Sequence, residues 1–197
     1  TIDALSQTFD HLHHVVKGVS ADQLTAATPC REWDVRALLD HTFSVVGGLT
    51  AAAAGREPSP ILLDEGDLAG QFRALADESL TTWQAPGVLD REMNGGAGPM
   101  PGAAYASINT LDTLVHAWDL ACATGQDAAL PAALAQHVLG ICQQVVTPEA
   151  RQFAGFDPAI DPPEQRLRLL LRPRQRDARE LGPPRVHQRA EEHPAVG

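Results

Sequence analysis

The strongest constraint on the fold is a helical repeat of apolar residues that recurs between glycine and proline breaks. In residues 2–17 the apolar side chains are spaced three and four apart, which places them on one face of an α-helix. The same spacing returns in residues 35–54, 64–84, 103–124 and 131–146. The first four ranges each stop just before a helix-breaking residue: Gly18, Gly55, Pro86 and Gly125. This pattern predicts an all-α helical bundle, with one extended piece at 88–93.

Residues suited to helix starts support these ranges. Asp34 is a good N-cap for 35–54, Asp64 begins the range 64–84, and Pro131 suits the first position of the fifth helix. Between the third and fourth helices, residues 86–102 are rich in glycine and proline. We expect this segment to be a loop that lies across the mouth of the bundle.

Composition excludes several classes of function. The 197 residues carry a net charge of −10, and residues 1–163 hold seven Lys and Arg against twenty Asp and Glu, a net −13. An acidic body argues against nucleic-acid binding. No run of about 20 uninterrupted apolar residues predicts a membrane span. Three scattered cysteines (Cys30, Cys122 and Cys142) form no disulfide framework, and no leader pattern opens the chain, so we expect a cytoplasmic protein. The sequence is compatible with a homodimer as well as with a monomer.

The last part of the chain has a different composition. We place the folded domain at residues 1–163 and a C-terminal extension at 164–197, which holds eight arginines against five acids. The leucines of 167–171 could dock one last turn or strand. From about residue 172 the chain is arginine, proline and polar residues, which cannot offset their ordering entropy by burial, so we predict disorder. We interpret this stretch as a non-native or frame-altered terminus rather than a basic interaction tail.

The residues best suited to chemistry lie in the predicted fourth helix. Asp112 and His116 are four apart, so they project from one face, and Asp119 lies on the same stripe. We expect apolar residues to flank this stripe along the buried seam, namely Ile108, Leu111, Val115, Trp118 and Cys122. His41 lies among apolar residues on the inward side of the second helix. Two histidines and a carboxylate could hold a metal and leave one position open for water or substrate.

Structural roles also account for the same residues, and the spacing alone favours them over a metal site. An Asp and a His four apart form an ordinary surface pair in many helices, and a lone histidine such as His41 is often a core residue. Asp119 either orients one of the metal ligands through a hydrogen bond or forms an ordinary side-chain pair on the helix. The same two roles are possible for Asn109, one turn before Asp112. Cys30 is interpreted as a buried, inert thiol, because no histidine is near it in the sequence.

We expect the remaining candidate residues to have structural roles. His11, His13, His14 and His137 are expected on the surface, and Trp33 and Trp118 are expected to pack at the ends of the bundle. The glycines of 95–102 are no phosphate cradle, because no Gly-Lys-Ser/Thr follows them. No G-x-S-x-G element indicates a serine hydrolase.

Two motifs give the chain a family resemblance. The segment TPCREWDVRALLDH at 28–41, followed by LDTLVHAWDLACATGQD at 111–127, resembles the N-terminal family of mycothiol-dependent maleylpyruvate isomerases. That family belongs to the DinB-like superfamily of four-helix metal-binding bundles, and the similarity runs from about residue 2 to 163. It implies a divalent metal, zinc or nickel, bound by His41, Asp112 and His116. Asp112 stands where some members have Glu, and its shorter side chain demands closer helices.

The resemblance also implies a function. Members of the superfamily include thiol-dependent S-transferases and an isomerase that uses mycothiol, so we expect an S-transferase with mycothiol as co-substrate and an electrophilic small molecule as substrate. A metal holds a thiol as thiolate near neutral pH. Two alternatives stay open: a metal-dependent hydrolase that lowers the pKa of bound water, and a non-catalytic metal-binding or interaction module.

Overall fold

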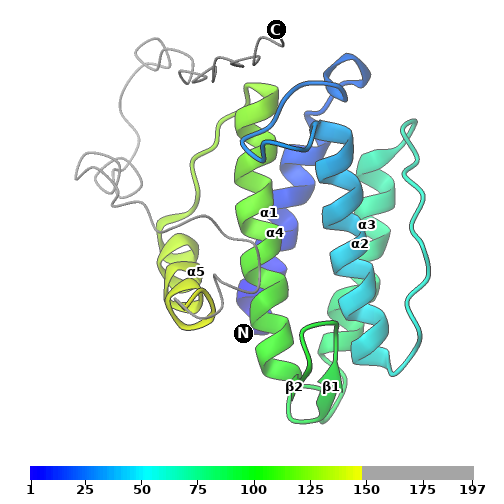
Figure 1. Cartoon of the computed structure of the whole chain (residues 1–197), viewed down its shortest axis with the longest axis vertical. Helices are drawn as coiled ribbons and strands as arrows, with labels where there is room; N and C mark the ends of the chain where they lie inside the picture. Colours follow the sequence, from blue (N-terminus) through cyan, green and yellow to red (C-terminus); the bar gives the residue numbers. More distant parts are fainter. Residues whose placement is uncertain (148–197) are drawn as a thin grey trace, which may run out of the picture.

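Four long helices lie side by side along the long axis of the molecule (Figure 1). The computed structural model describes residues 1–147. The bundle helices are α1 (Ile2–Lys17), α2 (Val35–Ala54), α3 (Leu68–Trp83) and α4 (Gly102–Thr124). A short 3₁₀ helix, η1 (Ala21–Gln23), a two-stranded hairpin, β1 (Glu92–Asn94) and β2 (Pro99–Pro101), and a fifth helix, α5 (Ala132–Val145), complete this part of the chain. The prediction of an all-α, DinB-like four-helix bundle is confirmed.

The four helices close a ring in which each helix contacts two neighbours. α4 packs against α1 and α2, and α3 packs against the other sides of α1 and α2. α1 and α4 run in one direction, whereas α2 and α3 run in the other (Figure 1). The connection at residues 55–67 makes this topology possible, because it returns along the outside of the bundle from the end of α2 to the start of α3.

Side-chain caps fix where the middle helices begin. The Asp34 carboxylate accepts a hydrogen bond from the backbone N–H of Ala37 at 2.8 Å, as predicted. The predicted start of the third helix at Asp64 is wrong: Asp67 is the N-cap, and its carboxylate accepts from the N–H of Gly70 at 2.9 Å. Asp64 instead closes a turn through the N–H of Gly66. Both aspartates are good capping residues, and the turn between them decides which one begins α3.

The interior of the bundle is packed with a few large rings. Phe72 of α3 meets Phe9 of α1 edge-on, with ring centroids 6.0 Å apart, and meets Phe43 of α2 at 5.1 Å. All three are fully buried, as are Trp83 and Tyr105 to within 1%. These contacts tie three of the helices together. The backbone that carries the candidate site residues on α2 therefore rests on a well-packed core.

The predicted extended piece at 88–93 is only partly correct. β1 begins at Glu92 and pairs antiparallel with β2, with Met93 opposite Met100. The sequence did not indicate β2, because two of its three residues are prolines, which cannot donate to a ladder and are confined to sheet edges. Both strands of a two-stranded hairpin are edge strands, so the hairpin tolerates prolines.

The glycine-rich loop of the hairpin closes one end of the bundle (Figure 1). The hydroxyl of Tyr105 donates to the carbonyl of Gly98 at 2.6 Å and accepts from the N–H of Ala97 at 3.1 Å. This end lies at the start of α4, and Asp112 lies about 15 Å further along the helix at 1.5 Å per residue. The loop therefore closes the end of the bundle at which α4 starts, whereas Asp112 lies near the middle of α4 and His41 lies in the first half of α2, toward the opposite end.

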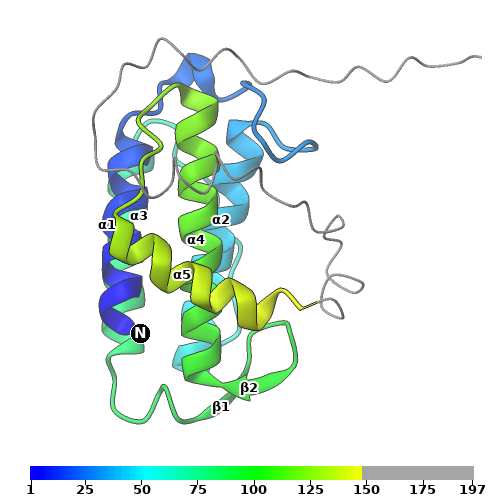
Figure 2. The same cartoon turned by 90° about the vertical axis from the view of Figure 1, so that its left-hand side faces the viewer.

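α5 crosses the outer side of α4 at a steep angle (Figure 2). Leu134 and Val138 of α5 bury Leu114 of α4 in a small second core. α5 does not cover the whole outer face of α4: Val115 is 44% exposed and Trp118 is 36% exposed, and Cys122 is exposed too. The prediction that these three side chains line the buried seam, and that Trp118 packs an end of the bundle, is wrong.

Within residues 1–147, α2 is the one helix long and apolar enough to cross a membrane by length and composition. Half of that stretch is buried inside the protein, against α3 and α4. This is the burial expected of a core helix of the bundle. The expectations for the leucines of 167–171 and for disorder from about residue 172 lie outside the described residues.

Candidate metal centre

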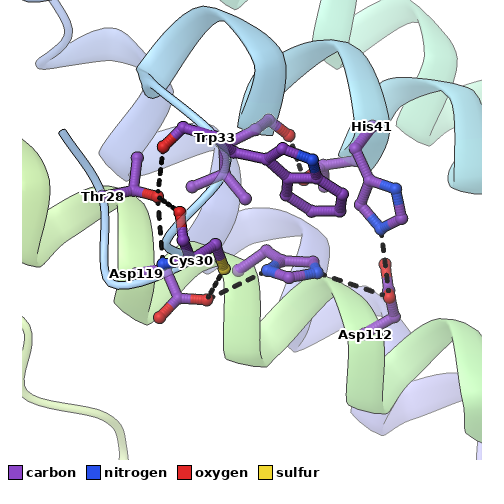
Figure 3. Close-up of polar contacts among 9 residues, drawn as sticks. Thr28, Cys30, Trp33, His41, Asp112 and Asp119 are labelled. Atoms are coloured by element: carbon purple, nitrogen blue, oxygen red, sulfur yellow. Dashed lines mark hydrogen bonds and ion pairs between the residues drawn. The ribbon is translucent and has the colours of Figure 1, made fainter. Parts of the chain in front are cut away.

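The structure brings the three predicted ligands together from two helices. His41 lies on α2 and Asp112 lies on α4 (Figure 3). His116 follows Asp112 by one turn on α4. One ligand atom from each side chain lies within 4.8 Å of the other two. All three side chains are partly buried, with exposed fractions of 31% for His41, 24% for Asp112 and 13% for His116. The cluster is therefore shielded on one side by the bundle and open to solvent on the other.

The separations between these atoms fit a shared ion better than they fit hydrogen bonds. Oδ1 of Asp112 lies 3.5 Å from Nε2 of His41 and 3.6 Å from Nε2 of His116. Direct N–H···O bonds are usually 2.7–3.2 Å long, so both contacts are weak. Ligand atoms of a tetrahedral zinc ion, at metal–ligand distances of about 2.0–2.2 Å, stand about 3.4 Å apart. The spacing thus leaves room for a cation among the three side chains.

One oxygen of the cluster has no partner. Oδ2 of Asp112 is buried, and no hydrogen bond reaches it within the described part of the chain. A buried carboxylate oxygen without a donor is unfavourable, because desolvation of the charge is not compensated. A bound cation would relieve this penalty. The residues present therefore fit a divalent metal on an observation independent of the ligand spacing.

Asp119 sets the orientation of His116. Its Oδ2 lies 3.0 Å from Nδ1 of His116, a normal hydrogen-bond distance, and the carboxylate is 7% exposed. Because the Asp119 carboxylate can only accept this hydrogen bond, the ring proton of neutral His116 lies on Nδ1, and Nε2 is left free to act as a ligand on the side of Asp112. The structure thus places the Asp119 carboxylate against the ring nitrogen of His116 that is not directed toward Asp112.

Asn109 points elsewhere. It is fully buried, and its Oδ1 accepts a hydrogen bond from the hydroxyl of Thr113 at 3.2 Å. Its Nδ2 has no partner, and among the described residues no hydrogen bond joins it to His41, Asp112 or His116. The structure therefore does not bring Asn109 into the ligand cluster, although it lies on the same helix.

Two residues of the turn before α2, Trp33 and Cys30, lie beside the candidate ligands. The sequence did not indicate that either residue would contact them. The ring of Trp33 lies over His41, with centroids 4.4 Å apart and planes tilted by 35°, and lies 5.8 Å from His116. Trp33 therefore packs against the candidate ligands and not only against the bundle end. Cys30 places its Sγ 3.4 Å from Oδ2 of Asp119 (Figure 3).

The surroundings of Cys30 keep its thiol protonated. Burial, together with the nearby Asp119 carboxylate, raises the pKa of Cys30 from 9.0 to about 11. The thiol therefore carries its proton near neutral pH, as the interpretation of an inert cysteine requires. Cys30 is partly exposed, however, and not buried as predicted. A histidine also lies near it in space, His116, although none is near it in the sequence.

The Thr28 side chain stabilises this turn, together with a backbone hydrogen bond from the N–H of Trp33 to the carbonyl of Cys30 at 2.9 Å. The Thr28 hydroxyl donates to the carbonyl of Trp33 at 2.8 Å and accepts from the N–H of Cys30 at 3.1 Å. A β-bridge between Ala27 and Asp34 closes the base of the turn. The motif that contains Thr28, Cys30 and Trp33 was visible in the sequence, but only the fold shows that it leads back to α4.

The other four histidines of residues 1–147 belong to neither group of candidate ligands. His14 and His137 are exposed, as predicted. His11 and His13 are half-buried, so their prediction as surface residues is wrong. Burial lowers the pKa of His11. His11 and His13 project about 200° apart on α1, and the packing of α1 against both α3 and α4 partly covers them on different sides of the helix.

Comparison with known proteins agrees with the geometry. Residues 5–121 match the family model described as the mycothiol maleylpyruvate isomerase N-terminal domain. Two relatives, both named as uncharacterized proteins from strains of Mycobacterium tuberculosis, are 35% identical over 167 residues, which covers 80% of this chain and 88% of each relative. No solved structure matches the chain. The matched residues include the whole candidate centre, and the chain belongs to the mycothiol maleylpyruvate isomerase N-terminal domain family.

Proposed function

We propose that this domain binds a divalent metal ion through His41, Asp112 and His116 and acts as a mycothiol-dependent S-transferase. The observation that carries the proposal is the convergence of these three ligand atoms within 4.8 Å, on two helices of a bundle of this family. The 3.5 and 3.6 Å separations and the unpartnered oxygen of Asp112 support a cation there.

The donor set indicates which ions suit the site. Two imidazoles and one carboxylate favour borderline ions such as Zn²⁺ and Ni²⁺ over Mg²⁺ or Ca²⁺, which take oxygen ligands. Three protein ligands leave a coordination position open. All three cysteines are free, which suits a reducing compartment such as the cytoplasm.

When bound, a divalent metal would favour the thiolate form of a small thiol at the open position. The protein's own residues prepare this position. Asp119 holds the Nδ1 proton of His116, and Trp33 covers one face of His41, which limits the direction from which ligands can approach. The overall transfer forms a carbon–sulfur bond between the thiol and an electrophilic substrate, and one substrate bond breaks. With a haloarene the carbon–halogen bond breaks, halide leaves and the thiol proton goes to solvent. With an epoxide a ring carbon–oxygen bond breaks, and the resulting alkoxide takes up a proton in place of the one lost by the thiol.

Metal analysis of purified protein tests the ligand set. We expect about one equivalent of zinc or nickel in the wild type and loss of it in His41→Ala and His116→Ala. His137→Ala is the matched control, because His137 is an exposed histidine on α5. Circular dichroism would verify that each variant is folded. Equal metal in all four proteins would overturn the proposed site.

A turnover assay tests the reaction. We expect the metal-loaded protein to conjugate mycothiol to a generic electrophile, such as an epoxide or a haloarene, and to lose all turnover when the thiol is withheld. Turnover that persists without thiol and produces a hydrolysed substrate would instead support the hydrolase. Absence of both reactions in a protein that binds metal would overturn the transferase proposal and favour a binding module.

A further inference from the structure

A second group of ligand-type side chains lies on the other side of His116. Cys30, His116 and Asp119 each offer a ligand atom within 4.8 Å of the other two. Oδ2 of Asp119 lies 3.4 Å from Sγ of Cys30 and 3.0 Å from Nδ1 of His116. This group uses the opposite ring nitrogen from the one that faces His41 and Asp112.

We propose that Cys30, Asp119 and Nδ1 of His116 form a second metal site, selective for thiophilic ions, that competes with the His41 site for His116. The existence of this second site does not depend on the proposed function. The competition for His116 does rest on it, because competition requires a metal ion bound at His41. The two can therefore fail separately.

The donor atoms and their spacing carry the proposal. A sulfur, a nitrogen and an oxygen around one tetrahedral ion stand about 3.3–3.6 Å apart, given bonds of about 2.0–2.3 Å. The observed 3.4 and 3.0 Å separations need shifts of only a few tenths of an ångström. Thiolate ligands select soft ions, whereas the His41 group contains no sulfur. The group with Cys30 should therefore prefer soft ions more strongly than the group with His41 does.

Charge and burial favour the same occupant. Asp119 is 5% exposed, so its carboxylate is largely removed from water. With Cys30 as thiolate, the two side chains carry two negative charges, which a divalent cation neutralises. Hard cations gain little from sulfur and have no advantage here over solvent. We therefore expect this site to bind soft divalent ions such as Cd²⁺.

Binding follows a simple proton balance. The sulfur–hydrogen bond of Cys30 breaks, a sulfur–metal bond forms, and one proton leaves to solvent. On neutral His116 the ring proton moves from Nδ1 to Nε2, so that Nδ1 can bind the ion. Nε2 then carries a proton and cannot be a ligand for an ion at His41 and Asp112. Occupation of one site therefore excludes the other.

Titration of the metal-free, full-length protein with Cd²⁺ tests the site directly, through the ultraviolet charge-transfer band of a sulfur–cadmium bond. We expect the band to saturate at one equivalent in the wild type and to persist in His41→Ala. It should be lost in Cys30→Ser, whereas Cys122→Ser is the matched control, because Cys122 is an exposed thiol on the same helix as Asp119. A band retained in Cys30→Ser would overturn the proposal.

The serine variant should keep its fold. Thr28 contacts the backbone N–H of Cys30 and not its sulfur, so the turn does not depend on the thiol. As a second, independent variant, Asp119→Asn should shift the Cd²⁺ titration midpoint to higher concentration. An unchanged midpoint in a folded Asp119→Asn protein would contradict the assignment of this carboxylate.

Competition between the sites has its own readout. Protein loaded with one equivalent of Zn²⁺ is mixed with Cd²⁺, and released zinc is followed with a chromogenic chelator. We expect release from the wild type and from Cys122→Ser, and its loss in Cys30→Ser. Equal release from Cys30→Ser would overturn the exclusion argument. Failure of the proposed function would appear differently, as zinc binding that does not depend on His41, and would leave the cadmium band unaffected.

Discussion

The two ring nitrogens of His116 face two halves of the site that are built in different ways. On one side, His41 and Asp112 belong to α2 and α4, long helices fixed by the bundle core. On the other side, Cys30 belongs to the turn at 28–33, which is held by the Thr28 hydroxyl, a backbone hydrogen bond from Trp33 to Cys30 and a β-bridge at its base. We call these the helical half and the turn half. The helical half should keep its geometry under changes that loosen the turn half.

The largest expected effect comes from the core beneath the helical half. Phe43 is fully buried on α2, two residues after His41 and on nearly the opposite side of the helix, and packs against Phe72. Phe43→Ala should lower the free energy of unfolding by about 3–5 kcal/mol, because it leaves a cavity. Urea denaturation measures this loss. Leu62→Ala, at a side chain 85% exposed, is the control and should change little. Equal losses in the two variants would contradict the assignment of Phe43 to the supporting core.

The next effect concerns the residue that serves both halves. Asp119→Asn removes the charged acceptor of His116, so affinity for Zn²⁺ at the helical half should fall about 10- to 100-fold. Isothermal titration calorimetry measures the affinity. Asp90→Asn, an exposed carboxylate before the hairpin, serves as the control. Unchanged zinc affinity in Asp119→Asn would mean that the carboxylate does not orient the ligand.

A smaller effect separates the halves. Thr28→Val keeps the size of the side chain but removes the hydroxyl that binds Cys30 and Trp33, so stability should fall by about 1 kcal/mol. The affinity for Cd²⁺ should fall more than the affinity for Zn²⁺, because only the turn half is loosened. Thr81→Val, an exposed threonine on α3, is the control for stability. A larger loss for Zn²⁺ than for Cd²⁺ would refute the division into two halves.

The smallest effect is a pH dependence within the turn half. Alkylation of Cys30 by iodoacetamide, measured with Cys122 and Cys142 replaced by serine, should rise through a midpoint near pH 11 and not near pH 9. The folded pKa lies above the unfolded pKa of 9.0, so the protonated thiol favours the folded state below about pH 9. This contribution is lost as the pH rises through about 11. A midpoint near 9 would show that Asp119 and burial do not act on the thiol.

The helical half could be predicted from the sequence for a physical reason. The helical period alone places Asp112 and His116 on one face, and the apolar neighbours of His41 place it on the inward side of its own helix. His41 and Asp112 are 71 positions apart in the sequence, and no local rule relates residues so distant from each other. The resemblance of two motifs to a family was needed to bring the helices together.

The turn half was missed because its contacts are not local. Cys30 and Asp119 are 89 residues apart, and no periodicity links a turn to a helix face. Local signals also failed where two capping residues competed, as at Asp64 and Asp67, and where prolines form a strand. The outer face of α4 was mispredicted because the position of α5 depends on packing and not on sequence period.

Trp33 has an optical consequence. Its indole lies 4.4 Å from the ring of His41 and 5.8 Å from that of His116, whereas Trp83 is buried in the core and Trp118 faces outward on α4. Indole fluorescence is quenched by nearby charged imidazolium and by many transition-metal ions. The chain therefore carries an intrinsic fluorophore beside both candidate sites, and its emission should report on their occupancy and protonation without an added label.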